Sequence, residues 1–114
     1  MPTGAAIRLA PYQDKLGIAE GIETSLAASI LFGMPVWAAT NAALLQNWTP
    51  PRSLRSVTIF GDNDAGATGQ AAAYILAQRL KTGGISATVE LPAHADQDWA
   101  DVFGRQLSSN VQAF

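Results

Sequence analysis

Residues 57–66 read VTIFGDNDAG, an apolar, β-prone run that ends in two carboxylates one residue apart. Residues 57–60 predict a strand that is buried on both faces of a sheet. Ligands of an open α/β sheet bind beyond the carboxyl ends of its strands, and Asp62 and Asp64 are predicted to lie there. Two carboxylates this close together suit a hard divalent cation, above all Mg²⁺. The competing interpretation is that one aspartate caps the helix that follows.

The acidic residues gather after predicted strands, whereas the predicted helices are nearly free of acid. Of the nine acids, all but Asp14 and Glu90 follow a predicted strand or lie in the turn after it. These acids are Glu20, Glu23, Asp62, Asp64, Asp96, Asp98 and Asp101. Because like charges at one edge of a sheet repel one another, a bound cation is the simplest way to offset them.

Composition limits the class of protein. The 114 residues are 48% hydrophobic and 14% charged, which is typical of one folded domain with a proper core. The chain has no cysteine, which excludes a disulfide framework and a zinc–thiolate site. We find no bilayer-spanning apolar run and no signal-peptide pattern, so we expect a cytoplasmic protein. With a net charge of -2, the domain lacks the strong positive field of a protein that binds nucleic acid by itself.

Strands and helices are predicted to alternate along the chain. The expected strands span residues 16–19, 36–39, 57–60 and 86–91. The expected helices span residues 22–32, 41–46, 69–82 and 98–107. Crossover helices between consecutive strands favour an α/β fold with a central, mostly parallel four-stranded sheet and helices on both faces. We expect one domain over residues 1–114, with a core at 16–107, a leading strand at 5–9 and a turn at 11–15, and a frayed tail at 108–114.

Four further side chains have predicted environments. Trp37 is expected in the core, whereas the pattern around Trp48 and Trp99 predicts less burial. Packing is the simpler role for the latter two, and stacking on nucleic-acid bases is the alternative. His94 lies in a polar loop without partners and is expected to be exposed to solvent rather than catalytic.

Three short motifs, each at a predicted strand end, together resemble a known family. EGIET at 20–24, DND at 62–64 and DWAD at 98–101 look like the motifs of the Toprim domain. Bacterial-type primases, type IA and type II topoisomerases, OLD-family nucleases and recombination-repair proteins share this metal-binding catalytic domain. The resemblance covers roughly residues 16–103 and implies a compact, Rossmann-like fold. EGIET and the segment at 69–73 are most similar to the primases and primase-helicases of phages and plasmids.

The resemblance implies roles for the acids. Glu20 corresponds to the catalytic glutamate, and Asp62 and Asp64 to the pair that holds Mg²⁺ or Mn²⁺. Further candidates for the same site are Glu23, Asp98, Asp101 and Asn41. The implied activity is Mg²⁺-dependent nucleotidyl transfer by a DNA primase or primase-helicase, which makes short primers on single-stranded DNA from nucleoside triphosphates. A helicase domain or partner is implied as well.

Two other functions are compatible with the same residues. A Toprim nuclease of the OLD type would use the carboxylates to activate water, and a non-catalytic module would bind metal and DNA or a partner without turnover. A topoisomerase is disfavoured, because neither Tyr12 nor Tyr74 has the context of a transesterifying tyrosine. The sequence shows neither a zinc-binding module nor a basic subdomain, so we expect a fragment of a longer protein.

Overall fold

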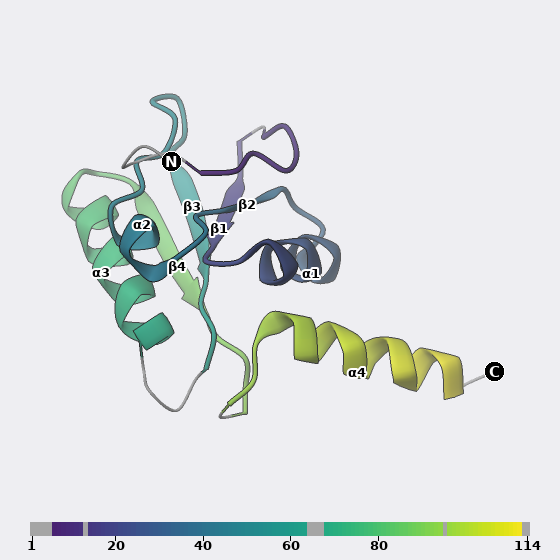
Figure 1. Ribbon diagram of the computed structural model, residues 1–114. Helices are drawn as coiled ribbons and strands as arrows, with labels where there is room; N and C mark the ends of the chain where they lie inside the picture. The colour runs from purple at the N-terminus through teal and green to yellow at the C-terminus, as the bar shows by residue number, and fades with distance from the viewer. Residues whose placement is uncertain (1–5, 13, 64–67, 95, 113–114) are drawn as a thin grey trace.

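A computed structural model describes residues 6–12, 14–63, 68–94 and 96–112. Strands and helices alternate along the chain, as the sequence predicts (Figure 1). The strands are β1 (Leu16–Ala19), β2 (Val36–Ala38), β3 (Ser56–Phe60) and β4 (Ser86–Glu90). The helices are α1 (Ile22–Phe32), α2 (Ala42–Gln46), α3 (Thr68–Thr82) and α4 (Trp99–Gln112). Within these ranges, no helix has the length and apolar character needed to cross a membrane.

The strands form one four-stranded sheet in the order β2-β1-β3-β4, which confirms the predicted sheet. Every pair of neighbouring strands in it is parallel. The chain winds from β1 outward to β2, and then returns past β1 to β3 and β4. The direction of winding therefore reverses between β1 and β3. The crevice at their carboxyl ends is the topological switch point, where open α/β sheets bind ligands.

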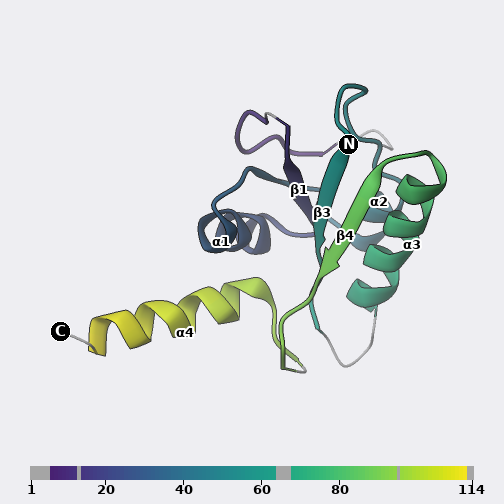
Figure 2. The same ribbon diagram turned by 180° about the vertical axis from the view of Figure 1, so that it is seen from behind.

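Helices cover both faces of the sheet, as Figure 1 and Figure 2 show. Helices α2 and α3 pack together on one face, and α1 and α4 pack together on the other. Alternate residues of a strand point to opposite faces. Val57 and Ile59 therefore join the core beneath α2 and α3, whereas Phe60 joins the core beneath α1 and α4. Strand β3 is buried on both faces, in agreement with its apolar sequence.

An aromatic cluster holds the start of α4 against the sheet. The rings of Phe32, Phe60 and Trp99 pack at steep angles to one another. Their centroids lie 4.8 Å apart for Phe32–Phe60, 5.2 Å for Phe32–Trp99 and 5.9 Å for Phe60–Trp99. The Phe60 ring lies against Gly17, where an added Cβ would come within 2.7 Å of Phe60 Cε2. Strand β1 therefore needs a glycine at this position.

All three tryptophans belong to the core. Trp37 is 3% exposed, Trp48 1% and Trp99 7%, so the predicted burial of Trp37 is confirmed. The prediction of less burial for Trp48 and Trp99 is wrong, because each ring fills space between a helix layer and the sheet. Neither ring offers an open face on which a base could stack.

The leading strand predicted at residues 5–9 does not form within the described residues 6–12. Ile7 makes one isolated antiparallel bridge with Ala38 instead. Arg8 lies over the ring of Trp37, 4.8 Å from its centroid, and Trp37 Nε1 donates to the carbonyl of Ala10 at 2.7 Å. The segment therefore curls over Trp37 rather than running along β2.

Helix α4 is longer than the helix predicted at residues 98–107, and the frayed tail at 108–114 stays a prediction. Helix α4 continues to Gln112, five residues beyond its predicted end at 107. Residues 105–112 contain neither glycine nor proline, so no local signal ends the helix. In Figure 1 and Figure 2 the second half of α4 projects away from the sheet.

Candidate active site

The carboxyl ends of three neighbouring strands position the predicted site residues. Glu20 follows β1, Thr40 comes two residues after β2, and Asp62 comes two residues after β3. Because Ala19 is in register with Phe60, Glu20 and Asp62 emerge on either side of the switch point. Both acids are half-buried. Asp64 lies outside the described residues.

The turn from β1 into α1 is fixed by Ser25. This side chain is fully buried, and its Oγ lies 2.7 Å from the carbonyl oxygen of Gly21 and 3.1 Å from that of Trp37. Gly21 is the N-cap of α1 and has extended backbone angles. Ser25 therefore ties the Glu20–Gly21 turn to β2, which is a structural role.

Thr40 has an unusual backbone at the edge of the site. Its φ of 86° lies in the left-handed region, which a β-branched residue rarely adopts. Its N–H donates to the carbonyl of Glu20 at 2.6 Å, so the strained residue is bound to the turn that carries the predicted catalytic acid. Strain of this kind is concentrated at functional sites.

A pocket of about 360 Å³ opens beside this turn. Its lining is Gly21, Ile22, Glu23, Thr24, Thr40 and Asp98. The first turn of α1 and the segment before α4 thus bring two predicted acids, Glu23 and Asp98, to one cavity. The N-terminal end of α1 favours negative charge here.

Asp98 and Asp101 cap α4 reciprocally. The backbone N–H of Asp98 donates to Asp101 Oδ2 at 3.0 Å, and that of Asp101 donates to Asp98 Oδ1 at 2.8 Å. This is the pattern of a capping box, with an aspartate in each position. Asn41 caps α2 in a similar way, because its Oδ1 accepts from the N–H of Leu44 at 2.9 Å. One oxygen of each of these side chains therefore serves a helix.

Asn63 joins the loop after β3 to the loop after β4, a role that our sequence reasoning missed. Its Nδ2 donates to the carbonyl of Pro92 at 3.0 Å, and its N–H donates to that of Gln97 at 2.9 Å. Its Oδ1 accepts from Gln70 Nε2 of α3 at 3.0 Å. Asn63 thus holds the neighbouring Asp62 in place. The only sequence signal is its position between two aspartates.

The acids at the switch point fit a magnesium site. Mg²⁺ binds one or two protein carboxylates and keeps water or phosphate oxygens in its other positions. Glu20 and Asp62 supply such oxygens from adjacent strand ends. Among the described residues, which omit Asp64, no three histidine, cysteine or acidic side chains form a metal-binding group. The donor set therefore suits an ion that shares its coordination with a substrate.

Comparison with protein families assigns residues 15–109 to the Toprim domain. The chain belongs to the Toprim domain family. In its fold, this Toprim domain is similar to a crystallised DNA primase domain from Pseudomonas aeruginosa, with a TM-score of 0.58 and 16% sequence identity. That likeness covers 82% of this chain and 30% of the solved chain. No curated protein sequence matches this chain.

Proposed function

We propose that this Toprim domain is the Mg²⁺-dependent nucleotidyl-transfer domain of a DNA primase or primase-helicase of the phage- or plasmid-borne type. The observation that carries the proposal is the position of Glu20 and Asp62 on either side of the switch point, inside the range that matches the Toprim family. The primase-type fold of the solved relative supports this choice among Toprim activities.

Glu20 is the proposed general base. It accepts the proton of an attacking 3′-hydroxyl, whose oxygen bonds to the α-phosphorus of a nucleoside triphosphate while pyrophosphate leaves. Asp62 and Asp64 are the proposed ligands of Mg²⁺ or Mn²⁺. A bound ion of this kind lowers the pKa of the hydroxyl and neutralises charge on phosphate oxygens.

The remaining acids have supporting roles in this proposal. Glu23 and Asp98 line the neighbouring pocket, where each can bind a water molecule or share a second ion. Thr40, held by its N–H on the carbonyl of Glu20, presents its side chain to the same pocket. Asn41 and Asp101 act through the helix ends that they cap.

Primer synthesis by the full-length protein tests the proposal. We expect short oligonucleotides from nucleoside triphosphates on single-stranded template, dependent on Mg²⁺ or Mn²⁺. Glu20→Gln should lower turnover by about 10²–10⁴-fold and leave template affinity unchanged, because a general base acts in the transition state. The matched control is Asp14→Asn, an exposed acid at the opposite, amino end of β1.

Other outcomes would replace the proposal. Degradation of DNA that depends on Glu20 would identify a nuclease of the OLD type. Binding of metal and template without synthesis, unchanged by Glu20→Gln, would identify a non-catalytic module.

A further inference from the structure

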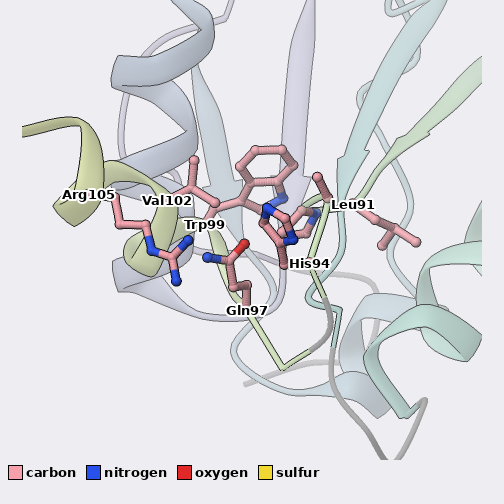
Figure 3. Close-up of a pocket in the computed structure, with 8 residues that line it drawn as sticks. Leu91, His94, Gln97, Trp99, Val102 and Arg105 are labelled. Carbon is pink, nitrogen blue, oxygen red and sulfur yellow. The ribbon is translucent and has the colours of Figure 1, made fainter. Parts of the chain in front are cut away.

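A second pocket, of about 320 Å³, shares a stretch of chain with the acidic pocket, as we call the cavity lined by Glu23 and Asp98. Residues that line it include Leu91, His94, Gln97, Trp99, Val102 and Arg105 (Figure 3). Asp98 lines the acidic pocket, whereas its two chain neighbours, Gln97 and Trp99, line this one. Residues 97–99 therefore contribute to both cavities.

Gln97 is the polar group at the base of this second pocket. The residue is 8% exposed, and its side-chain amide makes no hydrogen bond within the described part of the chain. Its amide atoms are not among the fully buried groups that lack a partner, so they reach solvent and are open to a hydrogen bond from a ligand. Trp99 Nε1 beside it is buried and also has no hydrogen-bond partner among the described residues.

The walls and the rim of the pocket differ in character. Leu91 and Val102 provide apolar walls, and none of the described residues in the lining is a carboxylate. At the rim, Arg105 and His94 are exposed, and neither forms an ion pair in the ranges that the structure describes. Figure 3 shows Gln97 between Arg105 and His94, with Trp99 above them. The pocket thus offers an apolar slot, an amide and a guanidinium.

We propose that this pocket binds one nucleotide, an inference that rests on the proposed nucleotidyl-transfer function. The base occupies the apolar slot, and its edge bonds to the amide of Gln97, which has both a donor and an acceptor as base edges do. The phosphate lies at the rim on Arg105, whose planar fork of donors suits phosphate oxygens. The pocket volume is at the small end of the range for small-molecule sites, which suits a single nucleotide.

This nucleotide has two possible sources, a free nucleoside triphosphate or one unit of a single strand. Either source places the nucleotide near the acidic pocket, because residues 97–99 contribute to the lining of both cavities. The site needs no metal, so its occupancy can be measured in EDTA, where metal-dependent binding at Glu20 and Asp62 is absent.

Nuclear magnetic resonance of the full chain in EDTA tests the proposal. We expect AMP to shift the Trp99 indole N–H signal and the amide signals of residues 97–105. Ribose 5-phosphate, which lacks a base, should bind at least severalfold more weakly. A short oligothymidylate that competes with AMP identifies the strand as the source, whereas ATP binding without such competition identifies the free nucleotide.

Three variants make the test specific. Arg105→Gln should weaken AMP binding about tenfold, the value of one charged hydrogen bond. Arg52→Gln removes the same charge from the exposed loop before β3 and should change nothing. Gln97→Met keeps the size of the side chain and should reduce AMP affinity to that of ribose 5-phosphate.

Several results would overturn the pocket proposal. They are equal effects of Arg105→Gln and Arg52→Gln, equal affinities for AMP and ribose 5-phosphate, or no shifts at the pocket with millimolar AMP or oligothymidylate. Primer synthesis that persists in the full-length protein despite such a result would leave the proposed function intact. If AMP shifts the signals of the pocket residues but the full-length protein synthesises no primers, the proposed function alone is overturned.

Discussion

Gly17 lies at a position in the sheet that has no room for a side chain. A Cβ here would lie 2.7 Å from Phe60 Cε2 and 2.9 Å from Val36 Cγ2. We expect Gly17→Ala to lower the free energy of unfolding by about 1–3 kcal/mol, the usual cost of overpacking a core. Urea denaturation measures this change.

Gly104 in α4 is the matched control for that substitution. Apart from its chain neighbours and the backbone of α4 itself, no atom of the described residues lies within 4 Å of a Cβ added there. Gly104→Ala should raise stability by about 0.5–1 kcal/mol, because alanine is the better helix former. If Gly17→Ala and Gly104→Ala change the free energy of unfolding equally, contact with Phe60 does not restrict the side chain at position 17.

Glu20 is expected to cost stability in the absence of a cation. It and Asp62 emerge on adjacent strands, and like charges held at one edge repel each other. In EDTA, Glu20→Gln should therefore leave the free energy of unfolding unchanged or raise it by about 0–1 kcal/mol. Denaturation of this variant beside Asp14→Asn checks the expectation. A clear loss of stability confined to Glu20→Gln would make the glutamate a structural residue instead.

At the scale of elements, α4 allows the capping and chemical roles of Asp98 to be separated. Asp98→Ala should lower stability by about 0.5–2 kcal/mol, because the N-cap is lost. Asp98→Asn keeps an oxygen that caps, so stability should stay near that of the original protein. If Asp98 also serves the acidic pocket, primer synthesis by the full-length protein should fall in both variants. Unchanged primer synthesis by the Asp98→Asn variant would show that Asp98 acts only as a helix cap.

Helix α1 shows how far periodicity can predict an element. The spacing of Ile22, Leu26 and Ile30 predicts a helix, and α1 forms there. These side chains are nevertheless 46%, 48% and 63% exposed, while the buried face carries threonine, serine and alanine. Small side chains let the helix approach β1 closely. Both faces of α1 repeat with the helical period. The sequence alone therefore does not indicate which face is buried, because the buried face is the less hydrophobic one.

At the scale of the whole molecule, local signals predicted the sheet but not the contacts between its loops. The four strands follow from β-prone runs, and the acidic edge follows from the acids placed after them. The bond from Asn63 to Pro92 joins residues 29 positions apart, and no local pattern indicates it. The pocket around Gln97 depends on the same loop pairing, so sequence reasoning did not find it either.

Charge limits what this domain can do without further basic surface. The chain has seven basic residues against nine acidic ones, and two of the basic side chains are already engaged. Arg79 donates to the carbonyls of Gln46 and Trp48, and Arg8 lies over Trp37. Arg105 remains as a cation beside the proposed nucleotide pocket.

We therefore expect the 114-residue chain to bind single-stranded DNA weakly and with little dependence on salt. One phosphate contact predicts a slope of about -0.7 in a plot of log affinity against log salt concentration. Fluorescence anisotropy over a range of salt concentrations measures this slope, and Arg105→Gln should bring it close to zero. The full-length protein should give a steeper slope, because the template of a primase needs several phosphate contacts. A slope for the 114 residues equivalent to five or more contacts would mean that this domain holds the template by itself, on a surface that its charges do not indicate.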